Sequence, residues 1–434
     1  MYGVKCCLTN MRRFAFYSLF TLASCGSLVI PITPNGGVDG TVIRVTTLAA
    51  KGPGSLRQAL EAEGPRLVVF EVGGVIDLEG RTLVVSHPHL TIAGQTAPDP
   101  GITLIRGGMV IKTDDVVVQH LVVRPGDSGP AGKEWAPDAL GVDGGHDVLF
   151  EHCSATWAVD ENLSTSGPAD VEDPSLTAHD ITLRHCLIAE GLSHATHPKG
   201  EHSKGTLVHD GVQNVLIEGC LYAHNRERNP RLKGGTTATV RDSLMYNWGS
   251  ACIGVGARGN RKMLKPAEAT IVGNVAIAGP DTKGKFFVKS VDPGGRVAMA
   301  NNVLVGVTLA DDGVVVTSGA AGFSPPIQAG GLKPAAPQAE RVLRTAGSRP
   351  AHRDPIDARI VQSVIDGGGR IIDSQNEVGG YPKREATTRK LVIPKDRRAW
   401  LAQLSKELEE DRVLDVKPLL KRLSAAAPSP GSQK

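Results

Sequence analysis

One short phrase recurs along the chain and limits what it can fold into: a polar residue, apolar residues at alternate positions, then a turn. Alternation with a period of two marks strands that have one buried face. Aligned on their second residue, the copies begin at 116, 148, 181, 215, 238, 269 and 297, so neighbouring copies are 23 to 34 residues apart. At least seven copies occur: Asp115-Val116-Val117-Val118, Asp147-Val148-Leu149-Phe150, Asp180-Ile181-Thr182-Leu183, Asn214-Val215-Leu216-Ile217, Thr237-Ala238-Thr239-Val240, Glu268-Ala269-Thr270-Ile271 and Arg296-Val297-Ala298-Met299.

No helical pattern intervenes between these copies. Strands of one kind, unevenly spaced and without crossover helices, argue against a doubly wound sheet or a barrel and favour stacked coils. The sequence therefore predicts an all-β fold, a right-handed parallel β-helix over residues 42–310. In the same alignment Cys153, Cys186 and Cys220 fall in one column, which Asn274 and Asn302 continue. We expect this column to be structural, with like residues stacked at the strand spacing of about 4.8 Å.

The two ends of such a solenoid need caps. Ser55 precedes an apolar face formed by Leu56, Ala59 and Leu60, which predicts a short N-terminal capping helix. Residues 311–355 are interpreted as a loop-rich segment because Gly, Ala and Pro dominate from about 319 to 337. Residues 356–424 form a C-terminal extension, in which 398–423 are expected to be one amphipathic helix packed on the solenoid. Residues 425–434 are expected to be a polar tail.

The composition sets further limits. Aromatic residues make up 4% of the chain while Gly numbers 51, which suits short strands and tight turns. Forty-eight basic and 45 acidic residues leave a net charge of +3, too close to zero to argue for a nucleic-acid partner or an anionic membrane surface. Any basic site must therefore be local.

The N-terminus resembles an export signal, residues 1–25. Met11-Arg12-Arg13 is followed by an apolar stretch from Phe14 to Leu22 that is too short to span a bilayer. Leu22-Ala23-Ser24-Cys25-Gly26 resembles a bacterial lipobox, with Cys25 as the residue that would be lipidated. Ordinary cleavage nearby and a translation start at Met11 stay open as alternatives. We expect a secreted or cell-envelope monomer whose contact with the membrane is a lipid anchor at Cys25 if one is present.

The strongest local concentration of positive charge lies at residues 224–235, directly after the Val215 strand. Lys199 and Lys204 follow the preceding coil, so two adjacent coils contribute cations. A run of solvated surface charge would look the same. Other features of the sequence have to decide between these readings.

Arg228-Asn229-Pro230-Arg231-Leu232-Lys233 resembles the Arg-x-Pro-x-x-Arg signature of family 1 pectate lyases. Further segments match landmarks of that family in the same order, over about residues 42 to 306. They are Gly54-Ser55-Leu56-Arg57-Gln58-Ala59-Leu60, Val69-Phe70-Glu71-Val72-Gly73-Gly74-Val75-Ile76, Leu90-Thr91-Ile92-Ala93-Gly94-Gln95 and Asp138-Ala139 followed by Val148-Leu149-Phe150-Glu151-His152.

The resemblance implies that Arg228 abstracts the C5 proton of a galacturonate, while Lys204, Arg231 and Lys233 bind the substrate. Lys233 stands where the family has Arg, and so lacks the bidentate fork that matches a carboxylate. An arginine acts as a base when its pKa is lowered from about 12.5. We expect the neighbouring cations to lower it and the activity to have an alkaline optimum.

The resemblance also implies a calcium cofactor, held by Asp138, Asp160 and Glu161. Asp138 and Asp160 match calcium-binding positions of the family, whereas Ser164 stands where the family has another Asp. Glu161 is the residue that could substitute for it. Calcium takes oxygen ligands and would neutralise the substrate carboxylate beside the proton that is removed. As isolated acids these residues would be ordinary turn residues.

Two other groups of residues are given no metal role. Asp143, in Val142-Asp143-Gly144-Gly145, is interpreted as a turn residue. The histidines at 194, 197, 202 and 209 have a spacing that fits no common zinc site, so we expect them to line a cleft.

The sequence thus predicts a calcium-dependent pectate lyase that cleaves polygalacturonate or pectin by β-elimination. The first alternative is a polygalacturonase-like hydrolase, because Arg231-Leu232-Lys233 resembles the Arg-x-Lys of those β-helices. Hydrolysis needs two positioned carboxylates, and the paired acids Asp114-Asp115 and Asp311-Asp312 lie in other coils. The second alternative is a polysaccharide-binding β-helix without activity.

Overall fold

The structure, a computed structural model, describes residues 33–130, 132–168, 171, 173–256, 266–291, 295–311, 314–316 and 335–426. The expected export signal with Cys25 and all but the first residues of the predicted tail lie outside these ranges. Within them, every helix is too short or too polar to cross a membrane.

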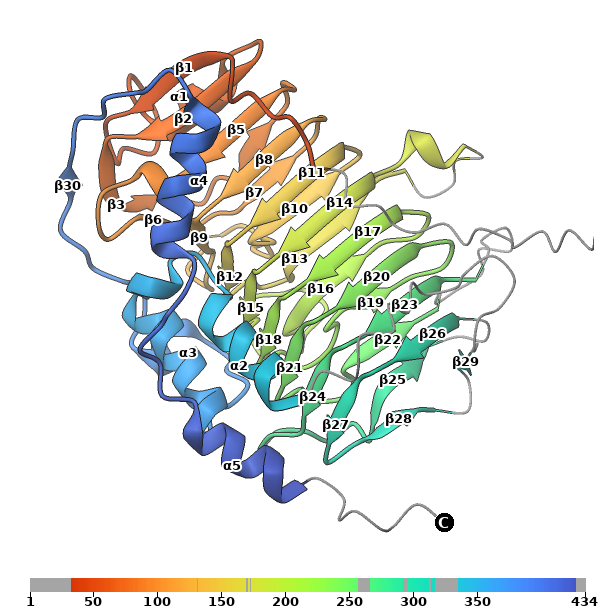
Figure 1. Cartoon of the computed structure of the whole chain (residues 1–434). Helices are drawn as coiled ribbons and strands as arrows, with labels where there is room; N and C mark the ends of the chain where they lie inside the picture. The colour runs from red at the N-terminus through yellow and green to blue at the C-terminus, as the bar shows by residue number, and fades with distance from the viewer. Residues whose placement is uncertain are drawn as a thin grey trace, which may run out of the picture.

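Three long sheets wind around one core and form a right-handed parallel β-helix, as predicted (Figure 1). Sheet 1 contains β1 (Thr41–Val45), β2 (Arg66–Phe70), β5 (Leu90–Ala93), β8 (Val116–Gln119), β11 (His146–Glu151), β14 (His179–Arg184), β17 (Gln213–Glu218), β20 (Thr237–Arg241), β23 (Glu268–Val272), β26 (Arg296–Ala300) and β29 (Val315–Val316). Sheet 2 contains β4 (Leu83–Val85), β7 (Met109–Ile111), β10 (Leu140–Asp143), β13 (Glu161–Ser166), β16 (Lys204–Val208), β19 (Arg231–Leu232), β22 (Ile253–Val255), β25 (Phe286–Ser290) and β28 (Thr308–Ala310). Sheet 3 contains β3 (Val72–Asp77), β6 (Ile102–Ile105), β9 (Leu121–Arg124), β12 (Ser154–Thr156), β15 (Leu187–Ala189), β18 (Leu221–Ala223), β21 (Leu244–Tyr246), β24 (Val275–Ile277), β27 (Val303–Val305) and β30 (Thr387–Thr388).

The repeat read from the sequence is the strand register of sheet 1. Its aligned residues pair in an unbroken row, strand to neighbouring strand: Val116, Val148, Ile181, Val215, Ala238, Ala269 and Val297. All seven side chains are buried in the core of the solenoid. The predicted register is therefore confirmed.

In four of the seven copies, the polar residue that opens the phrase adopts a left-handed backbone conformation just before the strand. Asp115, Asp147, Asp180 and Asn214 have φ values of 55°, 51°, 56° and 56°. Asp and Asn are enriched among the non-glycine residues that adopt this left-handed region. The occurrence of Asp or Asn at these four positions thus has a conformational reason.

The cysteine column is also confirmed. Cys153, Cys186 and Cys220 are buried free thiols, each donating to a backbone carbonyl of the preceding coil at 3.5–3.6 Å. Ser243, which the sequence reading passed over, continues the column by accepting from the backbone N–H of Cys220 and donating its own N–H to Asn274.

The N-terminal cap is α1 (Leu56–Glu61), whose N-cap Ser55 accepts from the backbone N–H of Gln58 as expected. The C-terminal prediction was partly wrong. The segment 311–355 holds β29, which extends the solenoid beyond 310, and a helix, α2 (Ala335–Thr345). The expected single helix over 398–423 is two helices, α4 (Arg397–Leu408) and α5 (Lys417–Ala426). A second unpredicted helix is α3 (Pro355–Asp366), and the short 3₁₀ turns are η1 (Gly94–Thr96), η2 (Pro174–Leu176), η3 (Pro350–His352) and η4 (Gln375–Val378).

Residues 335–426, here called the C-terminal extension, pack on the outside of the solenoid (Figure 1). Apolar side chains of α2 and α3 share one buried cluster with the outer face of sheet 3, and α5 packs on α3. Leu401 of α4 packs on Leu67 and Val69 of sheet 1. The expectation that this region packs back on the solenoid is confirmed.

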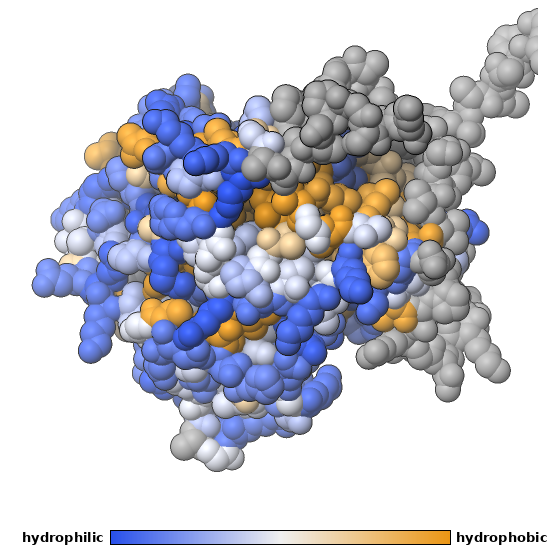
Figure 2. Space-filling view, turned by 90° about the horizontal axis from the view of Figure 1, so that it is seen from below, coloured by the Kyte–Doolittle hydropathy of each residue, from blue (hydrophilic) through white to orange (hydrophobic). Residues whose placement is uncertain are grey.

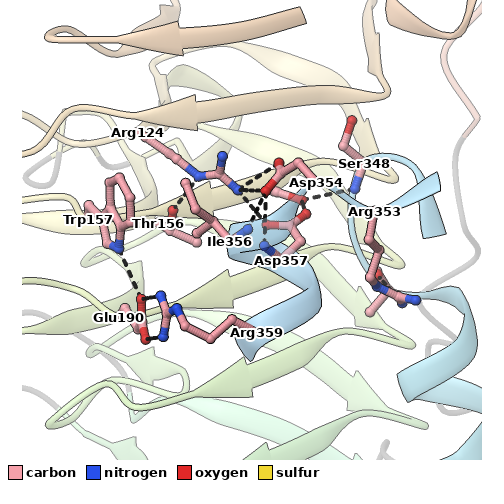
Figure 3. A network of polar contacts seen from close by, with 12 residues as sticks. Arg124, Thr156, Trp157, Glu190, Ser348, Arg353, Asp354, Ile356, Asp357 and Arg359 are labelled. Carbon is pink, nitrogen blue, oxygen red and sulfur yellow. Dashed lines mark hydrogen bonds and ion pairs between the residues drawn. The ribbon is translucent and has the colours of Figure 1, made fainter. Parts of the chain in front are cut away.

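Buried charged residues fasten the extension to sheet 3 (Figure 3). Arg124 of β9 is fully buried and pairs with Asp354 at 2.9 Å and Asp357 at 2.7 Å. Glu190 accepts from Trp157 at 3.0 Å and pairs with Arg359 of α3 at 2.6 Å. We call the three charged residues Arg124, Asp354 and Asp357 the docking cluster.

Apolar side chains gather on the surface at the end of the solenoid opposite α1, the face seen in Figure 2. The last coils, β27 and β28, contribute partly exposed residues there, including Leu309. Hydrophilic residues dominate the part of this face farthest from that patch, with smaller apolar groups among them.

Candidate active site

A groove of about 660 Å³ runs over the outer face of sheet 2. Six of the seven predicted site residues line it, namely Asp138, Asp160, Glu161, Arg228, Arg231 and Lys233. Lys199 lines it as well, as do two of the four histidines expected there, His202 and His209, whereas His194 and His197 do not. Residues spread over about a hundred positions of sequence are therefore brought into one cleft.

Strand register brings the key residues together. Glu161 opens β13 and pairs with Lys204, which opens β16. Lys204 in turn forms a bridge with Glu227 in the next coil, directly before Arg228. Because parallel strands start at the same edge of a sheet, residues at strand starts become neighbours across coils.

Arg228 has a φ of 65°, an uncommon conformation for a residue with a side chain. Its guanidinium forms an ion pair with Glu161, and its side chain is 26% exposed. Burial lowers the pKa of Arg228 from its usual value, while the carboxylates of Asp160 and Asp138 oppose the shift. The pKa of Arg228 is thus lowered, as expected, but not by the expected cause. Neighbouring cations were expected to lower it, whereas the groups that face the guanidinium are acids and burial lowers it.

Asp138, Asp160 and Glu161 form one acidic cluster, each offering a carboxylate oxygen within 4.8 Å of the others. Asp138 accepts from the backbone N–H of Glu161 at 2.9 Å and from the hydroxyl of Ser164. Burial, together with the nearby charge of Asp160, raises the pKa of Asp138 to about 7. The predicted metal residues therefore do lie together.

Two histidines hold Asp160. His202 Nε2 lies 2.6 Å from one of its carboxylate oxygens, and His197 Nε2 lies 3.6 Å from the other. Burial would raise the pKa of Asp160, but the hydrogen bond from His202 and the charges of both histidines bring it below its ordinary value. The rings of His197 and His202 are stacked, with centroids 3.7 Å apart and planes 7° from parallel. One ligand atom each of Asp160, His197 and His202 lie within 4.8 Å of one another, so this group could hold a metal ion although its spacing in the sequence fits no common zinc site.

Lys204 is placed differently from the prediction. Its side chain is 5% exposed, its ammonium contacts the carboxylate of Glu227, and it does not line the groove. Burial lowers the pKa of Lys204, opposed by Glu227. The prediction that Lys204 binds the substrate directly is therefore not supported by this geometry.

Arg231 and Lys233 project from β19 and its end into the groove. Lys233 Nζ lies 2.5 Å from Asp210 and 3.3 Å from His209 Nε2. Arg231 donates from Nη2 to the backbone oxygen of Gly256 at 2.8 Å. Both cations are accessible from the groove and fixed by the protein.

Sequence reasoning missed the acids that accompany these cations, chiefly Glu227 and Asp210. Glu227 could have been found, because it lies one coil after Lys204 in the same register position. Asp210 is buried beneath Lys233, and no pattern in the sequence marks it as a partner.

The acidic cluster fits a calcium ion. Its donors are carboxylate oxygens, which calcium prefers. Burial, and after it the charge of Asp160, raises the pKa of Asp138, and a divalent cation between the two carboxylates would offset both effects.

Comparisons with known proteins find relatives by sequence and by fold. No family model matches the chain. A protein of Aspergillus flavus named probable pectate lyase C is 36% identical over 257 residues, covering 58% of this chain and 54% of that protein. The chain therefore spans about half the length of the curated relatives it matches.

Solved structures share the fold. Jun a 1, the major allergen from cedar pollen, matches with a TM-score of 0.52 and 16% identity, over 71% of this chain and 89% of that one. The pectate lyase Bsp165PelA from Bacillus sp. N165, in complex with trigalacturonate, matches with a TM-score of 0.50 and 11% identity, over 72% of this chain and 95% of that one.

Proposed function

Because this chain belongs to the pectate lyase superfamily, we propose that it cleaves α-1,4-linked polygalacturonate by β-elimination and releases unsaturated oligogalacturonides. One observation carries the proposal: Arg228 stands in the groove with its pKa lowered by burial, beside three clustered carboxylates. The trigalacturonate bound by the Bacillus sp. N165 enzyme supports the substrate class.

In the proposed reaction Arg228, in its neutral form, takes the proton from C5 of a galacturonate. The electrons of the C5–H bond form the C4–C5 double bond and the bond from C4 to the glycosidic oxygen breaks. That oxygen takes a proton from water, and the protonated Arg228 returns its proton to the solvent. Burial favours the neutral guanidine, so we expect the rate to rise with pH.

Arg231 and Lys233 are the proposed ligands of substrate carboxylates, because both reach the groove from β19. Lys204 is given a supporting role: its buried ammonium fixes Glu227, the residue before Arg228. A calcium ion would be held by Asp138, Asp160 and Glu161, and would supply positive charge that neutralises the carboxylate beside C5.

Export through residues 1–25, acylation of Cys25 and a monomeric state remain parts of this proposal. The mass of the mature N-terminus tests the first two. An N-terminus that retains residues 11–24 with unmodified Cys25 would count against both.

The central test incubates the purified chain with polygalacturonate, with and without a chelator, and follows ultraviolet absorbance of the unsaturated product. A lyase gives absorbance that the chelator abolishes. A hydrolase would give new reducing ends without absorbance, and a binding protein would give neither. Arg226→Lys is the matched control for changes at Arg228, because Arg226 lies in the same loop and pairs with Glu201 at 2.8 Å.

A further inference from the structure

The groove extends beyond the predicted site residues. Along the outer face of sheet 2, register aligns Ser164 of β13, Leu207 of β16, Arg231 of β19, Gly254 of β22 and Lys289 of β25. All five residues line the same groove. The floor thus continues for two coils past Arg231 and ends at a second cation.

Gly254 keeps the groove open between these two cations. A Cβ at this position would lie 2.9 Å from Cδ of Arg231 and 3.4 Å from Cγ2 of Val291. A larger residue would press on Arg231 and fill the floor. The absence of a side chain leaves room for part of a ligand to lie between Arg231 and Lys289.

Lys289 also differs from the central cations in its charge environment. Arg228 pairs with Glu161 and Lys233 pairs with Asp210. Lys289 is exposed and forms no ion pair with the described residues. Its whole charge is therefore available to a ligand.

The spacing indicates the kind of ligand. Arg231 and Lys289 are two strands apart, about 9.6 Å at the strand spacing of a sheet. A single uronate has one carboxylate and cannot meet both cations at that separation. Two sugars of the same chain can do so.

We propose that Lys289 forms a distal subsite, which binds the carboxylate of a further uronate in the chain and makes affinity depend on substrate length. This proposal rests on the proposed function. Asp311, near this end of the groove, accepts a hydrogen bond from the backbone N–H of Ser290 at 2.9 Å.

The test measures binding of oligogalacturonates of increasing length by calorimetry, in full-length protein carrying Arg228→Lys so that the ligand is not consumed. Adding Lys289→Met should weaken binding of the long oligomers about two- to fivefold, the range of one exposed ion pair, and leave the short ones unchanged. Lys285→Met removes the same charge next to β25 at an exposed residue outside the groove, and should change nothing. Lys289→Arg should restore the length dependence.

Equal weakening at every length, or the same result for Lys289→Met and Lys285→Met, overturns the subsite. The outcome is separable from failure of the proposed function. If the unmodified chain makes no unsaturated product and binds no oligogalacturonate, the proposed function itself fails. If it does both and Lys289→Met has no length-dependent effect, the distal subsite alone is wrong.

Discussion

Two groups of charged residues on this solenoid use the same chemistry in different surroundings. In the docking cluster, Arg124 is 0% exposed and Asp357 is 3% exposed, beneath the C-terminal extension. In the groove, Arg228 is 26% exposed and Asp160 is 30% exposed. Both arginines face more than one carboxylate.

The two groups differ in whether a charged side chain can exchange its protein partner for a ligand. Arg124 is enclosed by the protein, so losing its acids would leave a buried charge without compensation. The side chains in the groove are open to solvent on one side, so a substrate carboxylate or a cation can take the place of a protein partner. Sealed charges therefore hold the extension in place, whereas open ones are available for binding and chemistry.

The largest expected effect is on the docking cluster. Arg124→Met leaves Asp354 and Asp357 without their guanidinium and should lower the free energy of unfolding by about 3–5 kcal/mol. Denaturant unfolding measures the loss, and turnover by the folded fraction should be unchanged. Arg412→Met, which removes an exposed pair with Glu410, should stay within about 0.5 kcal/mol. If Arg124→Met instead lost turnover while its free energy of unfolding stayed unchanged, the distinction between the docking cluster and the groove would be wrong.

The reverse pattern is expected in the groove. Arg228→Lys keeps the charge but moves the base away from the proton, which should reduce turnover at least about a hundredfold. Binding of polygalacturonate and the free energy of unfolding should change little, because the charge is kept. The same substitution at Arg226 should leave turnover near that of the unmodified chain. Near-normal elimination by Arg228→Lys would refute the proposed base.

The stability of the interface between the C-terminal extension and the solenoid should also depend on pH. Burial lowers the pKa of His224 from its ordinary 6.5 to about 4, and the ring is hydrogen-bonded to Ser363 of α3. Between these values the unfolded chain binds a proton that the folded chain does not, so stability falls as pH decreases from about 6.5 to 4. At pH 5 this costs about 2 kcal/mol. The free energy of unfolding is measured at pH 7.5 and at pH 5, and the difference between the two values should be smaller by about that amount in His224→Gln than in the unmodified chain. The same difference in both proteins would exclude this histidine as the cause.

The smallest effect is expected at the edge of the groove. Lys233→Ala removes a cation whose side chain is 20% exposed and should raise KM about two- to fivefold with kcat within about a factor of two. Steady-state kinetics on polygalacturonate measure both constants. A large fall in kcat at constant KM would instead place Lys233 in the chemical step.

The strands could be predicted from the sequence because alternation and register are local patterns repeated in each coil. The helices of the extension were harder. Asp354-Pro355 and Gly367 are start and stop signals of α3 that the sequence reading did not use, and Pro418 lies where a continuous helix over 398–423 would have needed an N–H donor.

The members of the site could be predicted, but their pairing could not. Arg228 was expected among cations and lies against Glu161, since the direction of a side chain is set by packing rather than by sequence position. Lys204 faces Glu227 for the same reason. The sequence motif therefore predicted which residues line the groove, whereas the ion pairs among them became known only from the structure.

The corners of the coils differ in a way that matters for engineering. Between sheets 1 and 3 the corner is His152 and Cys153 in one coil and His185 and Cys186 in the next. Between sheets 3 and 2 the connection is residues 125–139 before β10 but 157–160 before β13. Doubling the length of a loop adds only about 0.6 kcal/mol to its closure cost. The loops that carry the groove residues can therefore be exchanged as cassettes, and new specificities can be grafted onto this solenoid while the stacking of its coils stays fixed.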